Sequence, residues 1–149
     1  MKLNFRRFVC LALLALAATP SSGAAPAAAP PYRVIVNSKN PVQSLSRDKV
    51  AAYFLKKTST WDDGAAVQPV DQSDDTAVRK VFSTEVVKKS VSAVKAYWQQ
   101  RIFSGRDLPP PEKGSDDEVV AYVKSNDRAI GYVSASAEVA GVKVISVSE

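Results

Sequence analysis

The chain has 149 residues, of which 46% are hydrophobic and 23% are charged, and its formal net charge is +5 at pH 7. It has no histidine, which excludes serine–histidine and cysteine–histidine nucleophilic pairs. The length is enough for one domain with its own hydrophobic core.

The N-terminus has the pattern of a cleavable signal peptide, which we place at residues 1–24. Three cations lie in Met1–Arg7, and the apolar run Phe8–Ala18 is followed by small residues. That run is too short to cross a bilayer. Cleavage after Ala24 or after Ala17 fits a small-x-small site, and an uncleaved N-terminal anchor is the alternative.

Removal of the signal peptide changes the composition of the mature protein. Lys plus Arg falls from 20 to 17 because three cations precede the cleavage site, and with 15 acids the net charge becomes +2. A nucleic-acid partner is therefore not expected. Cys10 lies in the signal peptide, without the sequence context of a lipid anchor, and is removed with it. The mature chain then has neither cysteine nor histidine, which excludes the usual zinc sites. We expect periplasmic localisation, no membrane span after cleavage, an Ala/Pro linker at residues 25–31 and one domain at residues 32–149.

The domain is predicted to open with a strand, a polar loop and a helix. Tyr32–Asn37 is β-branched and mostly apolar, which indicates a buried strand. After the loop 38–44, Ser46 is a good helix N-cap. Val50, Tyr53 and Phe54 follow at helical spacing and form the predicted buried stripe.

A second strand, loop and helix are predicted over residues 67–82. The strand is 67–70, the loop is 71–76, and Val78 and Phe82 recur at helical spacing after it. A loop that leads into a helix N-terminus is a natural anion site. The acids in this loop have a simpler explanation, in which Ser73 or Asp74 is the N-cap and the acids stabilise the first turn.

The rest of the chain alternates helices and strands in the same way. One helix has Val91, Val94, Trp98 and Ile102 on one face, and three prolines make residues 105–114 an extended loop. Ser115 caps a further helix. Strands are predicted at 129–133 and 142–147. This order favours an α/β fold, with helices flanking a small mixed sheet.

Several segments occur in the order found in a known family. The chain resembles the phosphate ABC transporter substrate-binding proteins, which have the type II periplasmic-binding-protein fold, and it is similar to a short exported member with a single lobe. The segments that carry the resemblance are Asn37–Phe54, Asp62–Gly64, Pro69–Asp71, Val78–Phe82, Tyr97–Trp98, Ile102–Gly105 and Ala129–Val133.

The resemblance implies a set of residues that bind phosphate or a related oxyanion. Asp71 matches the family aspartate that accepts the proton of bound phosphate. Ser73 and Thr76 lie in the phosphate loop. Apart from the resemblance, a cation such as Arg79 or Lys80 could fold back over this loop and offset its carboxylates. Ser38 and Ser44 match ligand contacts in the first loop, although turn and cap chemistry explains them equally well.

Two departures from the family pattern bear on affinity. The chain is long enough for about one lobe, whereas family members close two lobes on phosphate. The loop reads Asp-Gln-Ser-Asp-Asp-Thr where the family resembles Asp-Gly-Ser-Gly-Thr, so Asp74 and Asp75 replace uncharged positions. Two carboxylates about 5 Å from a dianion would oppose it by roughly 3 kcal/mol in a water-like medium.

The sequence therefore predicts a solute-binding module linked to ABC-type transport. The alternative is a one-lobe envelope accessory or protein-interaction module that has lost phosphate binding. An ABC transporter or another envelope protein is the expected partner. Two Ser-x-x-Lys patterns, at Ser46 and at Ser92, lack the companion motifs of serine–lysine enzymes. We expect no catalytic residue, no metal and no cofactor.

Overall fold

The computed structural model describes residues 30–149. The predicted signal peptide, and the predicted linker up to residue 29, lie outside the described residues. Within the described part, no helix is both long and apolar enough to cross a membrane.

The structure is built on a five-stranded mixed sheet. The strand order is β2-β7-β1-β6-β3, and β1 at the centre is antiparallel to both of its neighbours. The two edge strands, β2 and β3, run parallel to β7 and β6. The strands are β1 (Tyr32–Asn37), β2 (Ser44–Ser46), β3 (Gln68–Pro69), β6 (Ala129–Ser134) and β7 (Val142–Ser148).

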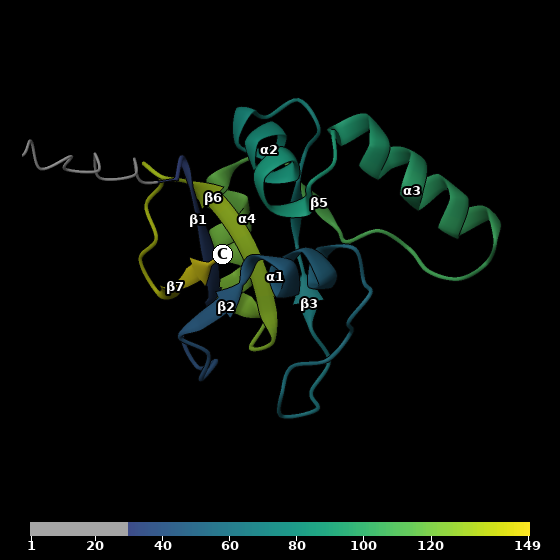
Figure 1. Ribbon diagram of the computed structural model, residues 1–149. Coiled ribbons are helices and arrows are strands. Elements are labelled where there is room, and N and C mark those ends of the chain that lie inside the picture. The colour runs from purple at the N-terminus through teal and green to yellow at the C-terminus, as the bar shows by residue number, and fades with distance from the viewer. Residues whose placement is uncertain (1–29) are drawn as a thin grey trace, which may run out of the picture.

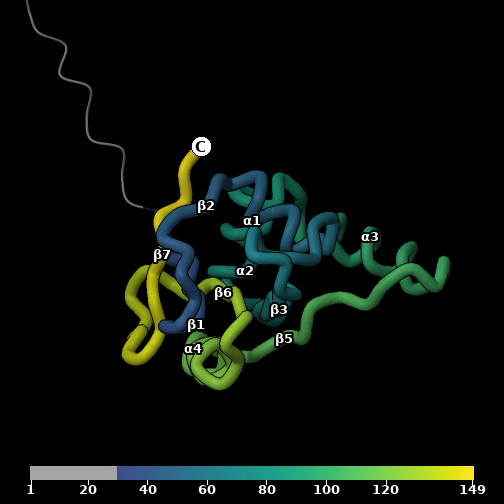
Figure 2. Tube along the Cα trace, turned by 90° about the horizontal axis from the view of Figure 1, so that it is seen from below, coloured from purple at the N-terminus to yellow at the C-terminus, as the bar shows by residue number. Residues whose placement is uncertain are grey.

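Helices cover both faces of this sheet (Figures 1 and 2). One face carries α1 and α2, the second of which continues into a π-helical turn, and the other face carries α4. The helix α3 and a short two-stranded sheet of β4 and β5 lie beyond β3. These elements are α1 (Arg47–Phe54), α2 (Ala77–Phe82), η1 (Ser83–Val87), α3 (Val91–Phe103), α4 (Asp116–Ser125), β4 (Asp71–Gln72) and β5 (Glu112–Lys113).

The alternation of side chains along β1 separates two hydrophobic clusters. Val34 and Val36 pack with the helices α1 and α2, whereas Ile35 packs with α4 on the opposite face. All three side chains are fully buried. The first cluster contains the Phe82 ring stacked on the Tyr132 ring, with centroids 3.7 Å apart. The sheet is therefore covered on both faces, which confirms the predicted α/β architecture.

The N-cap residues of two helices agree with the prediction from local sequence, and that of a third differs. Ser46 and Ser115 are N-caps as predicted, and each side chain accepts a hydrogen bond from a backbone N–H at 3.3 Å. The prediction that Ser73 or Asp74 caps α2 is wrong, because the cap is Thr76. The chain stays extended through residue 73 because Ser73 N donates to Lys113 O of β5 at 2.9 Å.

The predicted apolar face of α3 is buried over only part of its length. Val94 and Trp98 are buried, whereas 46% of Ile102 is exposed. Figure 1 shows the reason, since α3 projects from the body of the molecule. The helix thus has the predicted extent but packs mainly through its first turns.

Candidate functional site

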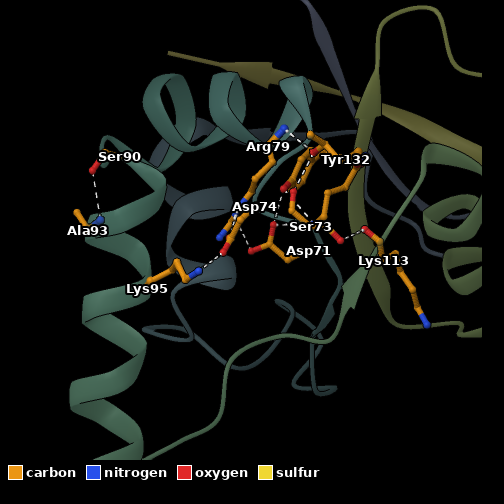
Figure 3. Close-up of polar contacts among 11 residues, drawn as sticks. Asp71, Ser73, Asp74, Arg79, Ser90, Ala93, Lys95, Lys113 and Tyr132 are labelled. Carbon is orange, nitrogen blue, oxygen red and sulfur yellow. Dashed lines mark hydrogen bonds and ion pairs between the residues drawn. The ribbon is translucent and has the colours of Figure 1, made fainter.

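The loop 71–76 is anchored by the buried carboxylate of Asp71, which is only 3% exposed. One oxygen accepts hydrogen bonds from the Tyr132 hydroxyl and from Gln72 N, the latter at 2.9 Å. The other oxygen pairs with the Arg79 guanidinium, which reaches back from α2 (Figure 3). This group joins the loop, α2 and β6.

Burial and charge pairing shift the pKa values of Asp71 and Arg79 in opposite directions. Burial raises the pKa of the Asp71 carboxyl above its ordinary value, against the attraction of Arg79 and the hydrogen bonds from Tyr132 and Gln72. For Arg79, burial lowers the pKa, but the charge of Asp71, the interaction with Tyr132 and the hydrogen bonds to both together leave the pKa raised. The guanidinium is therefore charged, and it is committed to a partner inside the protein.

Asp74 also has cationic neighbours. Its carboxylate pairs with Lys95 of α3 at 2.6 Å and lies 3.8 Å from Nε of Arg79. Figure 3 shows Lys95 reaching the loop from α3. Nearby, burial and then the carboxylates of Asp74 and Asp71 raise the pKa of Glu112. The carboxylates of Asp71 and Asp74 are thus compensated by Arg79 and Lys95, which are both engaged in ion pairs. The third loop carboxylate, of Asp75, is exposed.

A hollow of about 250 Å³ opens beside this loop. Among residues 30–149, Asp116 is the one charged residue that lines it, and its carboxylate is held by three hydrogen bonds. Oδ1 accepts from Gln72 Nε2 at 2.7 Å and from Ser134 N at 3.1 Å, and Oδ2 accepts from the Ser134 hydroxyl. The lining residues are Gln72, Thr76, Ala77, Val78, Gly114, Ser115, Asp116 and Ser134.

The hollow brings together hydroxyl and backbone donors from two helix starts. Ala77 and Val78 occupy the first turn of α2, where N–H groups have no partner within the helix. Ser115 is the N-cap of α4, and its oxygen accepts from Glu118 N. Its hydroxyl proton is therefore available to a ligand.

Four of the six residues implied by the resemblance lie together. Thr76 lines the hollow, and Ser73 lies one turn away with its hydroxyl directed to Lys113 O at 3.3 Å. Asp71 and Arg79 lie beneath the loop, in the buried group described above.

The remaining two residues lie elsewhere. Ser38 follows the last residue of β1, whereas Ser134 pairs with Tyr32 at the first residue of β1. Ser44 begins β2, the edge strand opposite β3. The structure therefore does not bring Ser38 or Ser44 to the loop.

The sequence did not single out Asp116, Ser134 or Tyr132 as site residues. Ser115 is predicted only as the N-cap of a helix, with Asp116 next to it in the sequence, and Tyr132 lies inside the predicted strand 129–133. The one available signal was the Ala-Ile-Gly-Tyr-Val segment of the family resemblance, which contains Tyr132 and ends next to Ser134.

Comparisons with known proteins agree with the fold. The sequence profile of the PBP superfamily domain matches residues 23–146. No curated protein matches the chain. The structure is similar to a candidate phosphate ABC transporter substrate-binding protein with bound phosphate from Clostridium perfringens, with a TM-score of 0.63 and 20% identity. It is also similar to an ABC-type phosphate transport receptor from Vibrio cholerae, with a TM-score of 0.62 and 17% identity. A third similar structure is PstS from Borrelia burgdorferi, with a TM-score of 0.61 and 11% identity.

These alignments cover 78% of this chain but only 44%, 45% and 46% of the three proteins. The chain thus spans less than half the length of each of these structures. The profile match extends over most of the sequence, and the structural matches show the type II periplasmic-binding-protein fold. The chain belongs to the PBP superfamily domain family, as the resemblance to phosphate ABC transporter substrate-binding proteins implied.

Proposed function

We propose that this protein is an exported, periplasmic solute-binding module of ABC-type uptake that takes phosphate or a related protonated oxyanion at the hollow beside Thr76 and Asp116. The proposal is for a binding protein and assigns no catalytic step. It draws on the family membership and on structural neighbours whose names refer to phosphate transport.

The free lone pair of Asp116 is the observation that carries the proposal. Each carboxylate oxygen has two lone pairs. Among the described residues, two donors occupy Oδ1, whereas Oδ2 has a single donor, the Ser134 hydroxyl. Oδ2 can therefore accept one more proton donor from the hollow. Because a carboxylate only accepts, this geometry favours a ligand with an O–H group, such as hydrogen phosphate, over sulfate.

The other implied residues receive supporting roles. The Ala77 and Val78 N–H groups and the Ser115 hydroxyl would donate to the ligand oxygens, with Thr76 beside them. Asp71 and Arg79 would hold the loop in place rather than touch the ligand, since both are buried. Ser38 and Ser44 have no role in this proposal.

We expect weak binding. No cationic side chain of the described part of the chain lines the hollow. One carboxylate about 5 Å from an anionic charge opposes it by roughly 0.8 kcal/mol per unit charge in a water-like medium. A single lobe also buries less of a ligand than a closed pair of lobes. Millimolar affinity for phosphate follows from these two effects.

The substitution Ala77→Asp tests the site with little risk to the fold. Ala77 is exposed at the first position of α2, where an acid stabilises a helix but would repel an anion in the hollow. Ala93→Asp is the matched control, since it places the same charge in the exposed first turn of α3. Phosphate and sulfate would be titrated by NMR, following amide shifts of residues 76–78 and 115–116.

We expect saturable shifts with phosphate, smaller shifts with sulfate, loss of the phosphate response in Ala77→Asp and an unchanged response in Ala93→Asp. Equal responses to phosphate and sulfate would contradict the role of Asp116. An absent response to tens of millimolar phosphate would contradict the proposal as a whole.

The second candidate is a one-lobe envelope accessory or protein-interaction module that has lost phosphate binding. The burial of Arg79 against Asp71 favours it, because this arginine beside the loop is withdrawn from any ligand. An unresponsive hollow in the phosphate titration would leave this candidate as the function to pursue.

A further inference from the structure

The helix α3, with the residues just before it and the loop after it, forms a projecting arm, which we define as residues 88–108 (Figure 1). Its base packs on the body through Val94 and Trp98, which are buried. Its far end exposes three large apolar side chains. Ile102 is 46% exposed, Phe103 is 91% exposed and Leu108 is 65% exposed. Apolar side chains gathered at the end of a projecting element indicate a contact surface.

The charge of the arm differs in sign from that of the body. The arm, residues 88–108, contains five cations and one acid, Asp107. The other described residues contain twelve cations and fourteen acids. The protein therefore presents a basic arm on a body that is acidic overall, and the arm is complementary to an anionic surface. The five cations are Lys88, Lys89, Lys95, Arg101 and Arg106.

Two of these cations line a cavity of about 230 Å³ near the end of the arm. The guanidinium carbon of Arg101 lies 5.4 Å from the centre of the Tyr97 ring and 6.0 Å from that of Trp98. Stacking of this kind fixes a guanidinium while leaving its N–H groups free. The other lining residues are Gln100, Ser104 and Arg106.

Arg101 is also short of hydrogen-bond acceptors. Its Nε is buried and has no hydrogen-bond partner among the described residues. The nearest carboxylate, of Asp107, is 3.9 Å from one of its terminal nitrogens and is shared with Lys56. A fixed arginine with unfilled donors, next to a second arginine, suits a phosphate group.

We propose that the arm docks on the surface of an anionic phospholipid bilayer. A headgroup phosphate would occupy the cavity between Arg101 and Arg106, while Ile102, Phe103 and Leu108 enter the headgroup region. Interfacial binding of this kind combines buried apolar area with attraction to anionic lipids. A second copy of this chain fits less well, because an arm-to-arm contact would bring two sets of five cations together. The proposal is independent of the oxyanion site beside Thr76.

Vesicle flotation of the full chain tests the proposal. Vesicles of phosphatidylglycerol mixed with phosphatidylcholine would be compared with phosphatidylcholine alone, for the wild type and for Arg106→Gln and Phe103→Ser. Both substituted residues are exposed, so the fold should be unaffected, and circular dichroism would verify it. Each variant keeps residues 1–29, so a difference from the wild type comes from the arm.

Matched controls make the same changes outside the arm. Lys39→Gln removes an exposed cation in the loop after β1, and Val144→Ser removes an exposed apolar side chain on β7. We expect preference for the anionic vesicles, loss of about fivefold in affinity for Arg106→Gln and about tenfold for Phe103→Ser. The two controls should stay within twofold of the wild type.

Three results would overturn the proposal. They are equal binding to both vesicle types, equal losses in the arm variants and in their controls, and no loss in either arm variant. A separate titration with inorganic phosphate distinguishes a free ion from a lipid headgroup. If 10 mM phosphate shifts the Nε–H resonance of Arg101 while the protein does not bind vesicles, the cavity takes free phosphate and the bilayer proposal is wrong.

Discussion

At the scale of single residues, Asp71, Arg79 and Tyr132 form a buried group whose members depend on one another. Asp71 accepts from both partners, and all three side chains are almost fully buried. A pair of this kind contributes little net stability relative to apolar residues, but removal of one partner leaves an uncompensated buried charge. The group therefore holds the loop 71–76 in place, and loss of the charged partner of Asp71 should destabilise the protein.

We predict that Arg79→Met lowers the free energy of unfolding by about 3–5 kcal/mol at pH 7. The lost guanidinium leaves burial as the main influence on Asp71, so the pKa of that carboxyl rises further in the folded state. The folded variant then binds a proton at higher pH than the unfolded chain, and the penalty shrinks as the pH falls toward 4. Urea unfolding at pH 7 and pH 4.5 measures both effects.

Lys80→Met is the control for this prediction, because Lys80 is the exposed neighbour of Arg79 on α2. Its effect should stay within about 0.5 kcal/mol. A loss below 1 kcal/mol for Arg79→Met, or a loss that does not diminish in acid, would show that the pair does not constrain the loop.

At the scale of elements, the close approach of α4 to β6 depends on a glycine. A β-carbon at Gly131 would lie 2.8 Å from a methyl group of Val119 and 2.9 Å from one of Val70. Both valines are fully buried, so neither can move away without disturbing the second hydrophobic cluster. The approach also brings the N-terminus of α4, with Asp116, to the end of β6 at Ser134.

We predict that Gly131→Ala destabilises the protein by about 1–3 kcal/mol through overpacking. It should also lengthen the contact between Asp116 and Ser134, because α4 must shift outward. Chemical denaturation measures the first effect, and the amide shift of Ser134 reports the second. Gly114→Ala is the control, since a β-carbon there would meet only a Glu118 carboxylate oxygen at 3.7 Å. Comparable losses in the two variants would refute the packing explanation.

At the scale of the whole molecule, stability in alkali should depend on the buried tyrosines. Burial, and then the charge of Asp71, raises the pKa of Tyr132 far above its ordinary value of 10. Burial also raises the pKa values of Tyr32 and Tyr53. The folded protein therefore keeps these phenols neutral at a pH at which the unfolded chain ionises them.

We predict that the free energy of unfolding falls as the pH rises above about 10. The contribution of neutral Tyr132 is complete below the pKa of the unfolded chain, and above it each pH unit removes about 1.4 kcal/mol. Urea unfolding between pH 8 and pH 11 measures this slope. In Tyr132→Phe the slope should be smaller but not zero, because Tyr32 and Tyr53 remain. Tyr122 is only partly buried, so an equal reduction of the slope by Tyr122→Phe would contradict the role of the buried tyrosines.

Local patterns were sufficient for much of the fold. The strand β1, the helices α1 and α4 and their caps Ser46 and Ser115 follow from residues within a few positions of one another. The cap of α2 was not predictable in this way. Whether residue 73 is extended or begins a helix depends on the pairing of β4 with β5, forty residues further along the chain.

The amino-acid sequence was sufficient to predict the α/β class, the family and the loop 71–76 as a candidate ligand site. Periodicity, capping and the ordered family segments are local or sequential properties, so they are present in the sequence before folding. Which side chains face the hollow depends instead on the tertiary structure. It turned Arg79 inward to Asp71, brought Asp116 to the loop through α4 and left the end of α3 exposed. Each of these outcomes depends on a contact between elements that are distant in sequence, and burial and charge pairing at such contacts are set by the packing of the whole sheet.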